Sequence, residues 1–151
     1  MRFLPLVILL LCAGCRDFAV DLGEDLPGKA FRSFDVRAHV PFEISVGDEA
    51  YLQIADMTLS FNMVLADTRC PDGVGCEHPG KADILMDISR TGGDDHQIVL
   101  QIPGQVRTPY ELNDFVQHRQ ERFQLLSLVP YPVEGTETAE ADYIATIYID
   151  R

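Results

Sequence analysis

The chain has 151 residues, of which 12 are basic and 24 are acidic, and its formal charge at neutral pH is −12. A chain of this length forms one domain with a sizeable core. An excess of negative charge repels nucleic acid and anionic lipid headgroups, so we expect neither as a partner. The charge would favour cationic partners or divalent cations, or it simply keeps the protein soluble.

The first residues of the chain have the order of an export signal. Arg2 is followed by an apolar stretch from Phe3 to Leu11, and two small residues precede Cys15. A positive start, an apolar stretch and a small-residue cleavage site define a secretory signal peptide. The apolar stretch is shorter than the ~20 residues that a membrane-spanning helix requires.

The cleavage site also resembles the lipobox of bacterial lipoproteins, in which a cysteine receives a diacylglycerol and becomes the N-terminus. The matching run is Leu-Cys-Ala-Gly-Cys at residues 11–15, with Cys12 where the family usually has leucine. The resemblance implies a signal peptide over residues 1–14 and lipidation of Cys15. Cys12 is a rival site, but the leucines before it offer the peptidase no small residue. An ordinary secreted protein, cut nearby, is the alternative.

Lipidation sets the expected location and charge of the mature protein. Loss of residues 1–14 removes only Arg2 among the charged side chains, so 11 basic and 24 acidic residues remain and the formal charge becomes −13. Each buried methylene contributes ~0.8 kcal/mol, so the acyl chains hold the protein stably on a membrane. We expect a protein exported and lipid-anchored to the bacterial cell envelope, on the inner or outer membrane, facing the periplasm or the surface.

Residues 15–33 are predicted to be the lipidated cysteine and a tether. Charged residues are frequent there, and Gly23, Pro27 and Gly28 interrupt any periodicity. Such a segment suits a flexible spacer between lipid and domain. An edge strand lying against the domain is equally compatible with the pattern, and the sequence does not choose between them.

From residue 34 to residue 151, apolar and polar residues alternate, which is the signal of β-strands. In one strand, Leu59, Phe61, Met63 and Leu65 are expected on one face. In residues 103–120 the weak spacing of Leu112, Phe115, Val116 and Arg119 fits a single helical turn or an irregular crossover. The glycine-rich turn at residues 91–95 predicts a hairpin between its flanking strands. The strands predicted by alternation cover residues 42–46, 51–54, 59–65, 82–88, 98–102, 123–129 and 143–149.

Short strands separated by turn residues predict an all-β fold, an antiparallel β-sandwich of about seven strands. One face of each strand is apolar and the other mostly polar, as expected for two sheets that share a core. The predicted sandwich domain covers residues 34–151.

The most distinctive segment contains two cysteines. Cys70 and Cys76 enclose five residues that include Pro71, Gly73 and Gly75, so the chain between them can turn back on itself. Exported proteins meet an oxidising environment, and a disulfide between these cysteines is therefore predicted. Closing so short a loop removes about 2–2.5 kcal/mol of unfolded-state entropy. The predicted role is to fix the turn between two core strands.

Two other uses of this segment remain open. Cys70, Cys76 and His78 could bind Zn or Cu(I), with Asp67, Asp72 or Glu77 as a fourth ligand, although the spacing matches no finger or ribbon. A redox-active pair is the other alternative, but thiol oxidoreductases place two residues between their cysteines at the start of a helix. The structure of the loop decides among these.

The same residues carry a resemblance to a group of uncharacterised bacterial lipoproteins with an Asp-Ser/Thr-Arg-Cys-Pro…Cys…Gly-x-Ala core. The matching residues are Asp67 to Cys76 and Gly80 to Ala82, followed by Leu125 to Pro132 and a final strand. The resemblance covers residues 42–150. This chain departs at Thr68, where serine is usual, and at residues 77–79, where an apolar-aromatic pair and a small residue are usual. The group implies a lipoprotein domain with a disulfide and no known activity.

No Gly-x-Ser-x-Gly elbow, glycine-rich phosphate loop or His-Glu-x-x-His pair is present. His39, His96 and His118 are scattered singly and are interpreted as surface or turn residues, and the acidic segment from Glu134 to Asp142 as a solvated loop. We therefore predict a non-enzymatic module without cofactor or metal, attached to the membrane by its lipid. Its partner would be an envelope protein or a cell-wall component, bound through loops or a sheet edge. The alternatives are an inhibitor of a cationic hydrolase, such as a lysozyme or protease, and a metal-handling module using Cys70, Cys76 and His78.

Overall fold

The computed structural model describes residues 31–93, 95–104 and 114–151. The predicted signal peptide, Cys15 and all of the predicted tether except residues 31–33 lie outside the described residues. Within the described ranges, no helix is long and apolar enough to cross a membrane. Nine strands and two short 3-10 helices are present there: β1 (Ser33–Val36), β2 (Phe42–Ser45), β3 (Glu49–Leu52), η1 (Gln53–Ala55), β4 (Met57–Asp67), β5 (Lys81–Arg90), β6 (His96–Pro103), β7 (Val116–His118), β8 (Glu121–Val129), η2 (Glu140–Asp142) and β9 (Ile144–Asp150).

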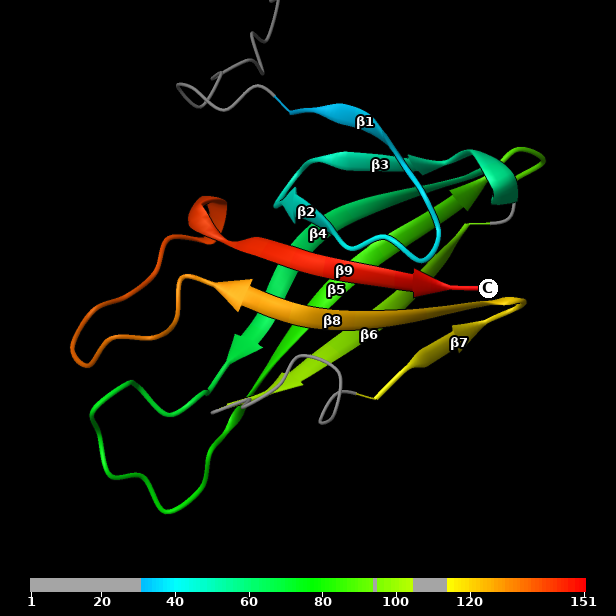
Figure 1. The fold of residues 1–151 in the computed structure, drawn as a ribbon. Coiled ribbons are helices and arrows are strands. Elements are labelled where there is room, and N and C mark those ends of the chain that lie inside the picture. Colours follow the sequence, from blue (N-terminus) through cyan, green and yellow to red (C-terminus); the bar gives the residue numbers. More distant parts are fainter. Residues whose placement is uncertain (1–30, 94, 105–113) are drawn as a thin grey trace, which may run out of the picture.

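The strands form two sheets, as the sequence predicts, and the all-β sandwich is confirmed (Figure 1). One sheet has the order β1-β3-β4-β5-β6 and the other the order β2-β9-β8-β7. Every pairing is antiparallel except that of β1 with β3, which is parallel. The two strands missing from the prediction, β1 and β7, are short and lie at sheet edges.

The core lies between the sheets and follows from the alternation of apolar residues. In β5, Ala82, Ile84, Met86 and Ile88 are fully buried, while the residues between them are partly exposed. Burial of each large aliphatic side chain contributes roughly 1.5–3 kcal/mol. From the other sheet, β8 and β9 present Phe123, Leu125, Leu128, Ala145, Ile147 and Ile149 to the same core.

The hairpins of β5 with β6 and of β7 with β8 each have a short turn between their strands. The predicted hairpin of β5 and β6 is confirmed, with Ile88 opposite His96 across the glycine-containing turn. In place of the predicted helical turn or crossover, Val116–His118 is a strand that pairs with β8. The turn between them places Arg119 at a φ of 56°, in the left-handed region. The helical spacing was misleading because three strand residues are too few to show alternation; residues 105–113 lie outside the described residues.

The prediction that Leu59, Phe61, Met63 and Leu65 share one face is wrong for the second half of β4. The pairing of β4 with β5 shifts register between Phe61 and Met63, and again between Val64 and Ala66. A β-bulge inserts an extra residue, so the side chains beyond it change faces. Phe61 is fully buried, whereas Met63 and Leu65 are 39% and 48% exposed.

Residues 32 and 33, which belong to the predicted tether, make contacts with the sandwich. Ser33 already belongs to β1, which is the edge strand of the five-stranded sheet. Arg32 donates from its backbone and its guanidinium to Asp48, with a shortest distance of 2.6 Å from Nη2 to Oδ2. The Asp48 side chain is only 2% exposed. This contact joins Arg32, which lies within the predicted tether, to the sandwich.

Candidate functional site

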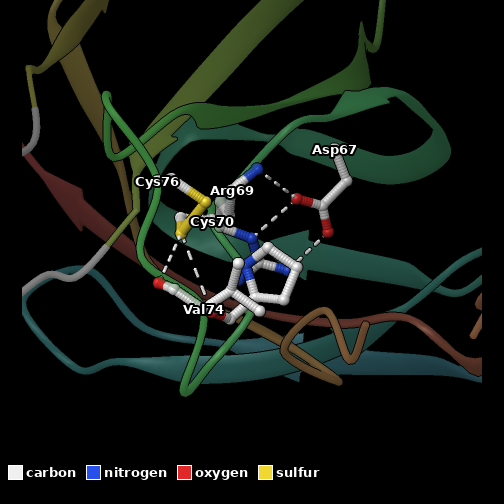
Figure 2. Close-up of a disulfide and its surroundings, with 6 residues drawn as sticks. Asp67, Arg69, Cys70, Val74 and Cys76 are labelled. Carbon is white, nitrogen blue, oxygen red and sulfur yellow. Dashed lines mark hydrogen bonds and ion pairs between the residues drawn. A yellow bond between two sulfur atoms is a disulfide. The ribbon is translucent and has the colours of Figure 1, made fainter. Parts of the chain in front are cut away.

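The loop that joins β4 to β5 is closed by a disulfide between Cys70 and Cys76, and that prediction is confirmed (Figure 2). Cys70 is buried and its backbone N–H donates to the carbonyl of Pro79 at 2.9 Å, which brings the two arms of the loop together. Gly80 completes the close approach, because its φ is +67° and a Cβ there would overlap the carbonyl oxygen of Thr68. The loop is therefore fixed at its base by backbone contacts and in its middle by the disulfide.

The disulfide removes the thiolates on which the metal-handling alternative depended. His78, Asp72 and Glu77 are exposed in the loop, and Asp67 is occupied by an arginine (below). Among the described residues, no group of three or more histidine, cysteine or acidic side chains is arranged to hold a metal ion. As long as Cys70 and Cys76 are joined, the predicted ligand set cannot assemble.

Arg69 is the residue that the sequence did not single out. Its side chain is 2% exposed and makes a two-point ion pair with Asp67, from Nε to Oδ1 at 2.8 Å and from Nη2 to Oδ2 at 2.6 Å (Figure 2). Asp67, 7% exposed, also accepts a hydrogen bond from the Tyr143 hydroxyl at 3.1 Å. A buried charge must be paired to be tolerated, and two parallel hydrogen bonds between guanidinium and carboxylate are the strongest such pairing.

The same guanidinium joins the two sheets. Nη1 donates to the carbonyl of Leu128 at 2.6 Å, and Nη2 donates to that of Pro130 at 3.1 Å. The Tyr131 ring lies against the cation, with its centroid 4.7 Å from Cζ. Arg69 comes from the β4–β5 loop, whereas Leu128 lies at the end of β8 in the other sheet and Pro130 directly follows that strand. We call this arrangement of Asp67, Arg69, Tyr143 and the β8 end the arginine clamp.

Beside the clamp lies an open groove of about 600 Å³. One wall is the end of β4, with Val64 and Ala66, and the other is the loop before β9, with Gly135, Glu137 and Glu140. The carboxylate of Glu140 crosses the groove and accepts a hydrogen bond from the Val64 backbone N–H at 3.3 Å. Every charged side chain lining the groove is acidic, and Arg69 neutralises only Asp67.

The pH dependence of stability follows from Asp67. Burial raises the pKa of Asp67, but the hydrogen bonds and the positive charge of Arg69 outweigh burial and hold this pKa below its ordinary value. A carboxylate whose pKa is lowered by folding stabilises the native state above its unfolded pKa, and this contribution is lost as the pH falls. We expect the free energy of unfolding to decline below about pH 4.

Urea denaturation at a series of pH values tests this expectation. The Asp67→Asn variant should be less stable near neutral pH and show a shallower decline in acid. The decline should persist in part, because Arg32 and backbone groups overcome the burial of Asp48 and lower its pKa as well. An unchanged acid slope in the variant would contradict the assignment to Asp67.

The disulfide gives a second prediction. A thiol alkylator added to the native protein without reductant should label neither Cys70 nor Cys76, and both should react after reduction. The Cys70→Ser, Cys76→Ser double variant should unfold with a free energy lower by about 2–2.5 kcal/mol, the entropy of so short a loop. Intact mass and urea denaturation measure the two effects. Labelling of native thiols would reopen the metal alternative.

The histidines that looked isolated in sequence are not all isolated in space. The rings of His96 and His118 lie 4.7 Å apart, where the edge of one sheet meets the edge of the other. Burial lowers the pKa of His118, and the nearby His96 and Arg90 lower it further. Arg90 in turn pairs with Glu121, which is 2% exposed, at 2.6 Å. Sequence gave no signal for this cluster because its members come from four different strands or turns.

Comparison with known proteins adds no assignment to this geometry. No protein-family model matches the chain, and no significant match is found among curated proteins or solved structures.

Proposed function

We propose that this protein is a lipid-anchored, non-enzymatic binding module of the bacterial cell envelope. The observation that carries the proposal is the arginine clamp together with the adjacent disulfide. Arg69, buried and hydrogen-bonded to Asp67, Leu128 and Pro130, holds the β4–β5 loop against the end of β8. Loops fixed before binding lose little conformational entropy when a partner binds, which favours recognition.

The anchor is supported by the lipobox-like run before Cys15, and the resemblance to uncharacterised lipoproteins agrees with it. Replacing Cys15 by alanine should release the domain from membranes into the soluble fraction, since the lipid is the expected attachment. The matched Cys12→Ala variant should remain on membranes. Fractionation and the intact mass of the mature chain measure this. A Cys15→Ala protein that stays on membranes, or a Cys12→Ala protein that leaves them, would contradict lipidation at Cys15.

Binding is tested with the full lipidated chain, extracted in mild detergent and mixed with envelope extract. The wild type should retain a defined protein or cell-wall fragment, and the Cys70→Ser, Cys76→Ser variant should retain less of it because its loop is no longer fixed. An unrelated lipoprotein of similar charge serves as the control for adhesion by charge alone. Retention of nothing specific, or equal retention by the control, would remove the proposal.

A second candidate is an inhibitor of a cationic hydrolase. The acidic groove favours it, since Glu137 and Glu140 are exposed and the mature formal charge is expected to be −13. Complementary charge steers such encounters and speeds association. Lysozyme and a basic serine protease assayed with a micromolar excess of the chain test the idea. Full activity of both enzymes at low salt would exclude these two targets.

A further inference from the structure

The outer half of β4 has no strand beside it on one side. β3 pairs with β4 only at residues 57–60, while β5 pairs along its whole length. The last backbone contacts on the β3 side are made by Phe61, which exchanges hydrogen bonds with Gly47 and Asp48. Beyond that point, in the described part of the chain, residues 62–67 form a sheet edge that has no strand beside it on the β3 side (Figure 1).

An edge of this kind carries backbone donors and acceptors that can pair with another strand. Here Val64 uses its N–H to reach the exposed Glu140 carboxylate, which substitutes for a strand carbonyl. A carbonyl from an incoming strand could take the same position and release Glu140. The groove of about 600 Å³ between this edge and the loop before β9 provides the space.

The two faces of the edge differ in chemistry. On the outer face, Met63, Leu85 and Val99 lie opposite one another across three strands and form an apolar row, with Met63 and Val99 each 39% exposed. A strand added beside β4 would lengthen this row beyond Met63. On the other face lies the loop from the second sheet, which brings Glu137 and Glu140 to the groove.

The negative charge of the groove indicates which kind of strand would bind at this edge. Neither Glu137 nor Glu140 forms an ion pair within the described residues, and the whole chain carries a formal charge of −12. A second copy of this chain would bring like charges together, which is unfavourable. Basic side chains would instead pair with the glutamates. In an added strand, alternate side chains point to opposite faces, so apolar residues would meet Met63 and basic residues would meet the groove.

We propose that residues 62–67 of β4 are a strand-addition site for an extended segment of a partner protein, in which apolar and basic side chains alternate. Main-chain hydrogen bonds to the edge would supply affinity, and the two faces would supply specificity. The inference rests on the proposed binding function and names where and what the protein binds.

The test uses the intact protein and a blocked hexapeptide of alternating lysine and valine. Two comparison peptides are an alternating glutamate and valine hexapeptide, and the lysine and valine peptide with methyl groups on alternate backbone nitrogens. Calorimetry gives the affinities, and amide hydrogen exchange locates the peptide. We expect slower exchange at residues 62–67 and about tenfold weaker binding of each comparison peptide.

The Glu137→Gln, Glu140→Gln double variant should bind the lysine and valine peptide about tenfold more weakly, since it loses both charges while keeping shape. The Glu43→Gln, Glu49→Gln variant makes the same change in net charge on β2 and β3, and should bind as the wild type does. Exposed positions leave folding intact in both variants.

Three results would contradict this site. The first is slower amide exchange at the edge of β6 in place of β4, and the second is binding of the methylated peptide as tight as that of the unmethylated one. The third is pairing of two copies of this chain through β4. If these occur while envelope extract still yields a specific partner, the binding function stands and only its location fails. If extract yields no partner, the binding function fails whatever the peptide does.

Discussion

Replacing Arg69 by alanine should lower the free energy of unfolding by about 3–5 kcal/mol, among the largest effects of any single substitution in this protein. The guanidinium makes four hydrogen bonds, two to Asp67 and one each to the carbonyls of Leu128 and Pro130. Its removal leaves the Asp67 carboxylate buried without its counter-charge, and the desolvation of that charge is no longer compensated. Equilibrium urea denaturation measures the loss.

The matched control is Lys81→Ala. Lys81 pairs with Asp83 at 3.0 Å, but its side chain is 52% exposed, so the pair is screened by water. Such a surface ion pair contributes about 0–1 kcal/mol. The Asp67→Ala, Arg69→Ala double variant should cost less than the sum of the single changes, because no lone charge remains. An Arg69→Ala cost as small as that of Lys81→Ala would show that the clamp does not hold the sheets together.

Phe61→Ala should cost about 3–5 kcal/mol, whereas Met63→Ala, only two residues away, should cost less than about 1 kcal/mol. Phe61 is fully buried in the core, and Met63 lies beyond the bulge with 39% of its surface exposed. Without the bulge, both side chains would lie on one face and both substitutions would open a cavity. The same denaturation experiment on both variants compares them directly. Equal losses of the free energy of unfolding in the two variants would indicate that Met63 is in the core and would contradict the bulge.

Much of the fold is predictable from the sequence, because a two-sheet core imposes a period of two. Residues 82–88 show that period clearly, and the predicted strand and its hairpin are confirmed. The bulge in β4 could not be predicted, since alternation continues through Phe61, Met63 and Leu65 while the backbone changes register. β7 was missed because its three residues leave no room for a pattern.

Of the candidate site, the sequence predicted the disulfide but not the buried arginine. The spacing of Cys70 and Cys76, together with the predicted export signal, sufficed to predict the disulfide. The sequence alone did not mark Arg69 as buried, because its partners Leu128 and Pro130 are about sixty positions away. A buried arginine is recognisable only when the fold supplies its acceptors.

The clamp gives a physical reason for the sequence pattern of residues 67–82. Asp67 and Arg69 form the buried pair, Gly80 allows the close approach to Thr68, and Ala82 is fully buried in the core. The Leu125 to Pro132 run supplies the carbonyls that accept from Arg69. These residues act on structure, so the pattern predicts a rigid loop end.

The central claim, that this protein binds a partner at the outer edge of β4, is tested most directly by site-specific photo-crosslinking in the native envelope. A photo-reactive residue is placed at position 65, where Leu65 is 48% exposed, and separately at position 54, where Ile54 is 68% exposed in η1, directly after β3. We predict one defined crosslinked protein from position 65 and none from position 54, with loss of the crosslink in the Glu137→Gln, Glu140→Gln background. No crosslink at position 65, or the same products from both positions, would contradict the claim.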